Sequence, residues 1–244
     1  MTGTLTIAGL GPGNEALITP EVSAALKSAT DVFGYAPYVA RVLPRNGLSL
    51  HPSDNREETK RACDALRLAS EGRQVVVVSS GDPGVFAMAS AVFEALEASP
   101  QWRDLPVRVL PGITAMFAAA ARIGAPLGHD FCAINLSDNL KPWKTIERRL
   151  KLAAEADFAI AIYNPRSASR PDGFARALDI LKDAGCGERL AIFARAISTP
   201  DETIETVSLR DARPEMADMK TLVIVGNSAT RRVGQWIYAP RSAG

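Results

Sequence analysis

The chain has 244 residues, of which 47% are hydrophobic and 23% are charged, and its formal net charge is +1. This length provides enough core for one large domain or two small ones, and the composition is ordinary for a soluble globular protein. A net charge this close to zero argues against recruitment to nucleic acid or to an anionic membrane by overall positive charge. The longest apolar run in mid-chain, residues 115–121, is far shorter than the roughly 20 residues that span a bilayer. The first residues lack the cationic segment of a signal peptide.

The three cysteines, Cys63, Cys132 and Cys186, are odd in number, widely spaced and without a CxxC pair. This pattern argues against a disulfide framework or a zinc site and predicts reduced thiols. We therefore expect a soluble cytoplasmic protein without a metal.

Predicted strands and helices alternate through the first half of the chain. Thr19 and Pro20 mark the start of one helix, and Asn55 with Glu58 is a plausible cap pair for another. Strands are expected at 4–8, 31–35, 75–78 and 107–110, and helices after residue 19, over 55–70, over 85–98 and after residue 115. Successive βα units of this spacing predict a mostly parallel α/β sheet.

The pattern changes after about residue 122. Residues 202–208 alternate between polar and apolar side chains, which is typical of a half-solvated antiparallel strand. Further strands are expected at 131–136, 158–163, 190–194 and 221–225, and helices at 143–155 and 174–184. We predict two α/β subdomains, 1–114 and 115–244, the second with a mixed sheet, packed closely enough to share a cleft.

The most informative segment is residues 74–86, QVVVVSSGDPGVF. Four valines bounded by turn residues predict a strand buried on both faces of a parallel sheet. Ligands of such sheets bind beyond the carboxyl ends of the strands, and this end carries Ser79, Ser80 and Asp82 between glycines. Asp82 suits a ribose hydroxyl or a cationic centre, and it is equally typical of an Asx turn or a helix cap.

A glycine-rich turn, residues 9–13, follows the first predicted strand. It does not match the dinucleotide-binding fingerprint, because Asn14 stands in place of the third glycine and Pro12 lacks a backbone donor. The lysine of a P-loop is absent as well. The turn therefore suits a neutral or cationic ligand better than a phosphate. Residues 111–115 (PGITA) offer a third small-residue strand end, which alone would fit an ordinary connection; the three together indicate a ligand site.

The motifs at residues 9–13, 80–86 and 111–115 resemble the three N-terminal signatures of the tetrapyrrole methylases, and the resemblance covers nearly the whole chain. It implies a two-domain fold distinct from the Rossmann methyltransferases, S-adenosylmethionine held between the two halves, a tetrapyrrole substrate and a homodimer. Residues 34–39, 164–167 and 226–228 are most similar to the members that methylate C17 of precorrin-3B and contract its ring in cobalamin biosynthesis. The cobalt-bearing counterpart of the anaerobic route, or another corrin, is the alternative substrate.

The resemblance also implies which residues contact S-adenosylmethionine. They lie in the three motifs and at two strand exits of the second half: Pro12, Ser80, Gly81, Asp82, Val85, Phe86, Thr114, Ala115, Tyr163, Asn164 and Ala196. Val85 and Phe86 are expected to form an apolar floor. Relatives often carry Met at the position of Asn164, and Tyr163-Asn164-Pro165 also fits an ordinary strand exit and turn.

The sulfonium methyl is already electrophilic, so the protein has to align it with a ring carbon and exclude water. Ring contraction additionally suggests a general acid or base near the C20 hydroxyl. The candidates by position are Asp82, Ser79, His129 and Arg195, although His129 is equally typical of a surface or capping group. The substrate carboxylates predict a basic rim, expected from residues in or near loops: Arg41, Arg45, Arg56, Lys60, Lys141, Arg166 and Arg170.

Two other classes of function stay open at this point. A nicotinamide-dependent oxidoreductase would use residues 9–13 with Asp31 as the ribose ligand, and Pro12 and Asn14 argue against it. A non-catalytic ligand-binding module has no positive support in the sequence.

Overall fold

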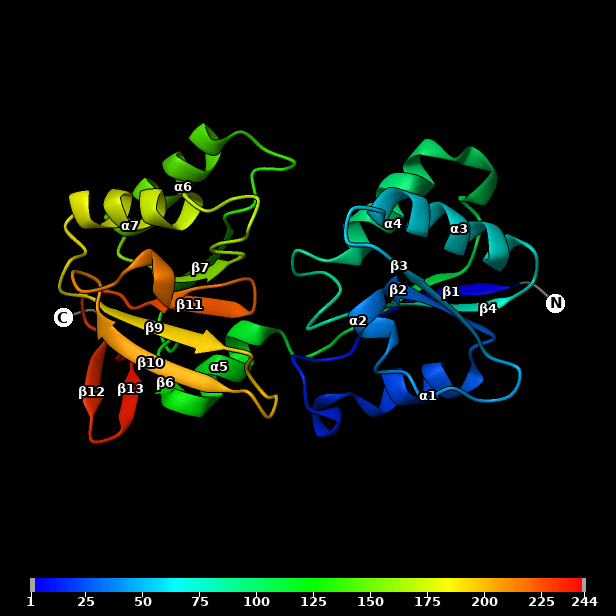
Figure 1. Ribbon diagram of the computed structural model, residues 1–244, viewed down its shortest axis with the longest axis horizontal. Helices are drawn as coiled ribbons and strands as arrows, with labels where there is room; N and C mark the ends of the chain where they lie inside the picture. Colours follow the sequence, from blue (N-terminus) through cyan, green and yellow to red (C-terminus); the bar gives the residue numbers. More distant parts are fainter. Residues whose placement is uncertain (1–2, 243–244) are drawn as a thin grey trace. The chain divides into compact units, whose positions relative to one another are not determined.

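The computed structural model describes residues 3–242 and consists of two compact units, the first ending at Thr114 and the second beginning at Ala115. Each unit is built around its own five-stranded sheet (Figure 1), so the predicted α/β class is confirmed. Within the described residues, no helix is both long enough and apolar enough to cross a membrane.

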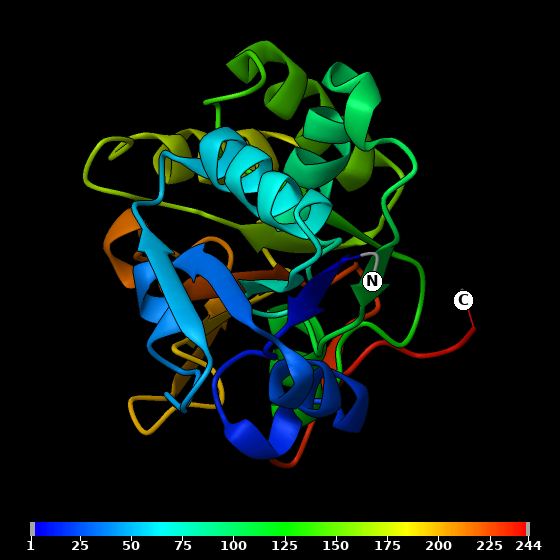
Figure 2. The ribbon, with the colours of Figure 1, turned by 90° about the vertical axis from the view of Figure 1, so that its right-hand side faces the viewer.

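The sheet of the first unit is parallel throughout, with the strand order β3-β2-β4-β1-β5. This order differs from the 3-2-1-4-5-6 order of a classical Rossmann sheet. Helices α3 and α4 cover one face of the sheet and α1 covers the other (Figure 2). The elements are β1 (Thr4–Gly9), α1 (Pro20–Ser28), β2 (Asp31–Tyr35), α2 (Ala36–Val39), β3 (Ser49–Ser53), α3 (Glu58–Ser70), β4 (Gln74–Ser79), α4 (Met88–Ala98) and β5 (Val107–Leu110), with short 3₁₀ helices at Glu15–Leu17 and Pro100–Trp102.

Strand β4 lies at the centre of this sheet, between β2 and β1. Val75 and Val77 belong to the core cluster under α3 and α4, whereas Val76 and Val78 belong to the cluster on the α1 side. All four side chains are at most 3% exposed, and burying each contributes roughly 1.5–3 kcal/mol. The predicted strand with two buried faces is confirmed.

The second unit has a mixed sheet with the order β10-β9-β11-β8-β7. Strands β8 and β9 both run antiparallel to β11, and β7 is parallel to β8, so the carboxyl ends of β7, β8 and β9 share one edge. Helices α6 and α7 pack on one face (Figure 1). The elements are α5 (Ala115–Ile123), β7 (Phe131–Asn135), α6 (Trp143–Glu155), β8 (Ala159–Tyr163), α7 (Gly173–Asp183), β9 (Leu190–Arg195), β10 (Thr203–Ser208), a 3₁₀ helix (Pro214–Met216) and β11 (Thr221–Val225). Strand β10 pairs antiparallel with β9, as its alternating pattern predicted.

A small third sheet was not predicted. It joins β6 (Gly124–Ala125), β12 (Arg231–Val233) and β13 (Trp236–Tyr238) in the order β12-β13-β6. Arg231 lies opposite Tyr238, donates from Nε to its hydroxyl oxygen at 2.9 Å and places its guanidinium over the ring. Arg231 and Tyr238 thus add a cross-strand side-chain contact to the backbone pairing of β12 and β13.

Two helix starts differ from the prediction. Asn55 and Glu58 do not cap α3; the helix begins at Glu58, and the Glu57 carboxylate accepts the Asp54 amide at 3.0 Å. Helix α4 begins at Met88 and not near residue 85, because Phe86 has a left-handed φ of 54° that a helix cannot contain.

Residues 49–53 form a strand that was not predicted. Pro52 is tolerated within it because β3 is an edge strand.

A charged cluster stabilises the amino end of β2. The buried Asp31 carboxylate accepts hydrogen bonds from Thr30 Oγ1 (2.7 Å) and Arg73 Nε (2.8 Å), and His51 Nε2 lies 2.9 Å away. The His51 ring stacks on Phe33 with centroids 4.1 Å apart. Burial raises the pKa of Asp31, but the hydrogen bonds from Arg73, His51 and Thr30 outweigh it, so the pKa lies below its usual value.

We expect the ionised Asp31 to stabilise the fold above its unfolded-state pKa of about 3.9, a contribution that is lost as the pH falls through the lower folded-state pKa. Asp31→Asn should reduce the free energy of unfolding at pH 7 by roughly 1.5–3 kcal/mol. The difference from wild type should shrink toward pH 3 in urea titrations. The exposed Asp201 gives a matched control, Asp201→Asn; a wild-type advantage that is constant from pH 7 to pH 3 would contradict the depressed pKa.

Candidate functional site

The carboxyl ends of β4, β1 and β5 are neighbours in the first unit and meet through three glycines. A Cβ at Gly9 would lie 2.5 Å from the carbonyl oxygen of Gly81 and 2.7 Å from the amide nitrogen of Gly112. A Cβ at Gly112 would lie 2.2 Å from the same Gly81 oxygen. The three loops therefore touch backbone to backbone, which only residues without a side chain allow.

The glycine-rich turn is also hydrogen-bonded to the loop after β4. Gly11 and Gly81 exchange two backbone hydrogen bonds, of 3.2 Å and 2.9 Å, and the Leu10 amide donates to Ser79 O at 2.8 Å. Both glycines have left-handed φ angles, 66° and 64°, a conformation that glycine adopts without a steric penalty. Pro12, the half-buried residue that follows Gly11, is thereby held at this edge of the sheet.

The Asp82 carboxylate connects two of these loops. Its Oδ1 accepts the Gly84 amide at 2.8 Å, which closes an Asx turn, and its Oδ2 accepts the Gly112 amide at 3.0 Å. Asp82 thus holds the β4 loop against the loop after β5. Each carboxylate oxygen can accept a further hydrogen bond, so this structural role leaves room for a ligand.

The residues on either side of Asp82 have distinct local roles. Ser79 is buried, and its Oγ accepts the Met88 amide at 3.3 Å at the start of α4. Ser80 is half-buried beside the glycine turn, with Oγ 3.5 Å from Gly11 O. Phe86 was expected in an apolar floor; its side chain is 48% exposed and its backbone is strained at φ 54°.

Val85 lies between these residues, half-buried, with its amide donating to Asp82 O at 3.3 Å. At the third strand end, Thr114 is buried, and Ala115 is the first residue of α5. The cofactor-contact residues predicted in the first unit therefore all lie at or follow the carboxyl edge of the parallel sheet. Asp31, the ribose ligand of the oxidoreductase alternative, begins β2 at the opposite edge and is fully engaged there.

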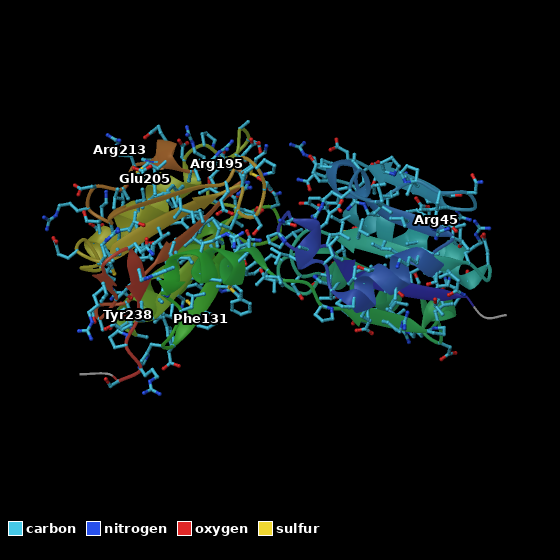
Figure 3. All side chains as sticks on the ribbon, turned by 90° about the horizontal axis from the view of Figure 1, so that it is seen from below. Arg45, Phe131, Arg195, Glu205, Arg213 and Tyr238 are labelled. Atoms are coloured by element: carbon cyan, nitrogen blue, oxygen red, sulfur yellow. The ribbon has the colours of Figure 1, made fainter. Side chains whose placement is uncertain are left out.

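Two arginines expected on a basic rim instead bind backbone carbonyls. Arg41 donates to Leu10 O (2.6 Å), Gly13 O (3.1 Å) and Gly11 O (3.2 Å). Arg45 (Figure 3) donates from Nη2 to the carbonyls of Leu26 and Ala29 at the end of α1. Sequence position showed that both were near loops, but not that both turn toward the backbone.

The second unit gathers polar groups where β8 ends. The Tyr163 hydroxyl accepts the Met116 amide at 3.2 Å in the first turn of α5. Asn164 follows with φ 51°, and its Nδ2 donates to Asn135 Oδ1 at 3.1 Å, at the end of the neighbouring strand β7. The predicted pair Tyr163 and Asn164 is thus completed by Asn135, which the sequence analysis did not single out.

The end of β9 lies at the same edge of that sheet. Arg195 (Figure 3) donates from Nε to Asp218 Oδ2 at 2.8 Å. Burial raises the pKa of Asp218, but hydrogen bonds from Thr221, Arg195 and Lys220 bring it below its usual value. Arg195 is therefore engaged in an ion pair.

Backbone strain is concentrated directly after β9. Ala196 and Ser198 have φ angles of 48° and 65°, unusual for residues with a side chain. The Ser198 Oγ is buried and has no hydrogen-bond partner within residues 3–242. A buried hydroxyl without a partner costs roughly 1–3 kcal/mol. Strained backbone and an unsatisfied group are typical of a ligand site.

His129 is separated from these groups. It precedes β7, at the opposite edge of the sheet from Tyr163 and Asn164, and its Nδ1 accepts the Asp130 amide at 2.8 Å. The predicted residues of β8 and β9 therefore lie at one edge of the sheet, with β11 between the two strands, and His129 lies at the opposite edge.

Among the other basic residues, Arg170 lies within 3.5 Å of the carbonyl oxygens of Leu136 and Asn164. Burial lowers the pKa of Lys141, and the positive charges of Arg149 and Arg170 lower it further. These three cations form the basic cluster of the second unit. Lys60 is paired with Asp64 at 3.8 Å on α3.

The strand exits of the two α/β units carry glycine turns, strained residues and one unsatisfied hydroxyl, which is typical of a ligand-binding α/β protein, and the strand order is not that of the Rossmann class. The profile of the tetrapyrrole (corrin/porphyrin) methylases matches residues 4–213, and the chain belongs to this family. The family predicted from the three motifs is confirmed.

Similar proteins cover nearly the whole chain. The precorrin-3B C(17)-methyltransferase of a Sinorhizobium species is 50% identical, covering 99% of this chain and 97% of that protein. A crystal structure of the methyltransferase CobJ is 66% identical and superposes with a TM-score of 0.96, covering 98% of this chain and 100% of that one. A probable cobalt-factor III C(17)-methyltransferase of Salmonella typhimurium is 41% identical over 97% of this chain and 98% of that protein.

We expect Asp82→Ala to lower the free energy of unfolding by roughly 2 kcal/mol, because the Gly84 and Gly112 amides lose a charged acceptor. Asp82→Asn keeps one side-chain oxygen and should lose about half as much. Asp104→Ala, at an exposed position, should stay within about 0.5 kcal/mol of wild type. Chemical denaturation measures all three; equal stabilities for Asp82→Ala and wild type would contradict the bridging role.

The glycine contact gives a second test. Gly112→Ala should destabilise the fold by roughly 3 kcal/mol, because the added Cβ meets backbone atoms that cannot move aside. Gly187→Ala is the matched control, since a Cβ there meets nothing within 4 Å. Thermal unfolding should separate the two variants clearly, and a Gly112→Ala protein as stable as Gly187→Ala would disprove the close approach.

Proposed function

We propose that this protein transfers the methyl group of S-adenosylmethionine to C17 of precorrin-3B and contracts the ring to precorrin-4 in cobalamin biosynthesis. The observation that carries the proposal is the 50% identity, over nearly the full length of both chains, with the precorrin-3B C(17)-methyltransferase. The cobalt-bearing counterpart is the second candidate substrate, favoured by the similarity to the cobalt-factor III relative.

The residues present fit S-adenosylmethionine. The buried Ser198 Oγ lacks a partner among the described residues, and Phe86, Asn164 and Ala196 are held in strained conformations at strand exits. Bound there, S-adenosylmethionine would supply an electrophilic methyl group. We propose that the residues in contact with it are Pro12, Ser80, Gly81, Asp82, Val85, Phe86, Thr114, Ala115, Tyr163, Asn164 and Ala196.

The basic cluster of the second unit supports recognition of an acidic substrate. Lys141 is partly buried beside Arg149 and Arg170, so a substrate carboxylate would relieve the repulsion between their charges. Arginine also suits bidentate binding of carboxylates. We propose that Lys141 and Arg170 hold substrate carboxylates. Arg170 makes only long contacts of 3.5 Å to two carbonyl oxygens, whereas Arg41 and Arg45 donate to backbone carbonyls at shorter distances.

Among the four candidates for proton transfer, Asp82 fits best. Ser79 Oγ is engaged with the Met88 amide, Arg195 is paired with Asp218, and His129 lies at the other edge of its sheet. Asp82 keeps acceptor capacity at the edge where the glycine turn lies. We propose that Asp82 accepts or holds a proton of the substrate there.

The proposal also includes a cytoplasmic homodimer that uses no metal. The three free cysteines suit a reducing compartment.

Incubation with S-adenosylmethionine and precorrin-3B, or its cobalt-bearing counterpart, tests the proposal directly. Product mass should rise by one methyl group in place of hydrogen, the absorption spectrum should show ring contraction, and omission of S-adenosylmethionine should abolish both. Turnover of the cobalt substrate alone would favour the second candidate.

Binding provides an independent prediction. S-adenosylhomocysteine should bind in calorimetry and NADH should not, and Asp82→Ala and Thr114→Val should each weaken S-adenosylhomocysteine binding about tenfold. Binding of NADH alone would overturn the proposal. Unchanged affinity in both variants would show that the site lies elsewhere.

A further inference from the structure

Arg41 is a cation engaged entirely with backbone carbonyls of the glycine-rich turn. It follows α2, is half-buried, and donates to the carbonyl oxygens of Leu10, Gly11 and Gly13 at 2.6–3.2 Å. Among the described residues, it has no carboxylate partner within salt-bridge distance. A cation in this position could bind an anionic ligand or could stabilise the turn. The geometry of its hydrogen bonds distinguishes these two roles.

The three acceptors lie within four residues of one loop. Two of the hydrogen bonds come from Nη2 and one from Nη1, so the planar fork of the guanidinium gathers three carbonyls at once. A lysine ammonium cannot reproduce this fixed arrangement. Burial lowers the pKa of Arg41, while Tyr38 and Glu15 raise it, and the group stays charged at neutral pH because its ordinary value is far above 7.

The turn needs such support. Gly11 has φ 66° and Gly13 is a second glycine, so the free segment would populate many conformations. The turn also makes the two Gly11–Gly81 hydrogen bonds, the bond from the Leu10 amide and a long contact of 3.5 Å from Ser80 Oγ to Gly11 O. These hold the first half of the turn, whereas the hydrogen bond from Arg41 to Gly13 O holds the second half, beyond Pro12.

We propose that Arg41 is a positioning residue, which fixes residues 10–13 in the conformation that receives S-adenosylmethionine and thereby sets the affinity for it. The inference rests on the proposed function and replaces the expectation that Arg41 binds a substrate carboxylate. The physical gain is preorganisation, since a turn already ordered does not have to be ordered on binding.

Arg41→Ala and Arg41→Lys test the inference, with calorimetry of S-adenosylhomocysteine and steady-state kinetics as readouts. The alanine variant should bind S-adenosylhomocysteine about tenfold more weakly or worse, and the lysine variant should recover part of the loss. The KM for S-adenosylmethionine should rise, while kcat and the KM for the tetrapyrrole at saturating S-adenosylmethionine should stay close to wild type.

Arg45→Ala is the matched control, because Arg45 also binds backbone carbonyls but at the end of α1. It should lower the melting temperature and leave S-adenosylhomocysteine affinity unchanged, which separates a loss of stability from a loss of positioning. Should Arg41→Ala not fold, Arg41→Lys and Arg41→Gln carry the same test.

Unchanged S-adenosylhomocysteine affinity in the Arg41 variants would overturn the inference, and a rise confined to the KM for the tetrapyrrole would restore the carboxylate-binding role. Failure of the wild-type protein to bind S-adenosylhomocysteine would instead refute the proposed function on which the inference rests.

Discussion

The close approach of Gly9, Gly81 and Gly112 is the constraint on which the first unit's candidate site depends. Three loops from adjacent parallel strands converge until their backbones touch. Polar side chains then hold them: Asp82 accepts amides from two loops, and Arg41 donates to the carbonyls of the third. The Asp82 carboxylate accepts backbone amides, and the Arg41 guanidinium donates to backbone carbonyls. These backbone groups therefore have partners even though the three loops converge closely.

In the second unit, the candidate site is marked by strained backbone conformations at the ends of strands. Asn164 and Ala196 follow parallel strands β8 and β9 directly, and each has a left-handed backbone. Strain of this kind costs of order 1–3 kcal/mol at each residue and persists only where the surrounding structure enforces it. The sheet of the second unit enforces these conformations, since the strands before both residues are almost fully buried. Rigid strands therefore carry the stability, and their exits carry the features expected of a binding site.

Much of this architecture could be predicted from local patterns. The four valines of β4, the Thr19-Pro20 start of α1 and the alternation in β10 each reflect burial or capping that neighbouring residues determine. The three-stranded sheet could not, because β6 has two residues and its partners lie more than a hundred positions away. The orientation of the Arg41 side chain could not be predicted either. The sequence shows a cation near a loop, whereas the carbonyl groups that it binds are some 30 residues distant in the chain. Asp82 was predicted both as a residue of an Asx turn and as a ligand contact, and the two roles are compatible because the Asx turn leaves acceptor capacity for a ligand.

The glycine contact also limits how such a protein could evolve. A side chain at Gly9 or Gly112 would collide with main-chain atoms, so neither position can be used to alter the shape or chemistry of the site. A lineage exploring new substrates would have to change the half-buried residues beside these glycines, such as Ser80 or Ile113. The backbone contact of the three glycines would then be kept nearly unaltered, while substrate selectivity changed through a few neighbouring positions.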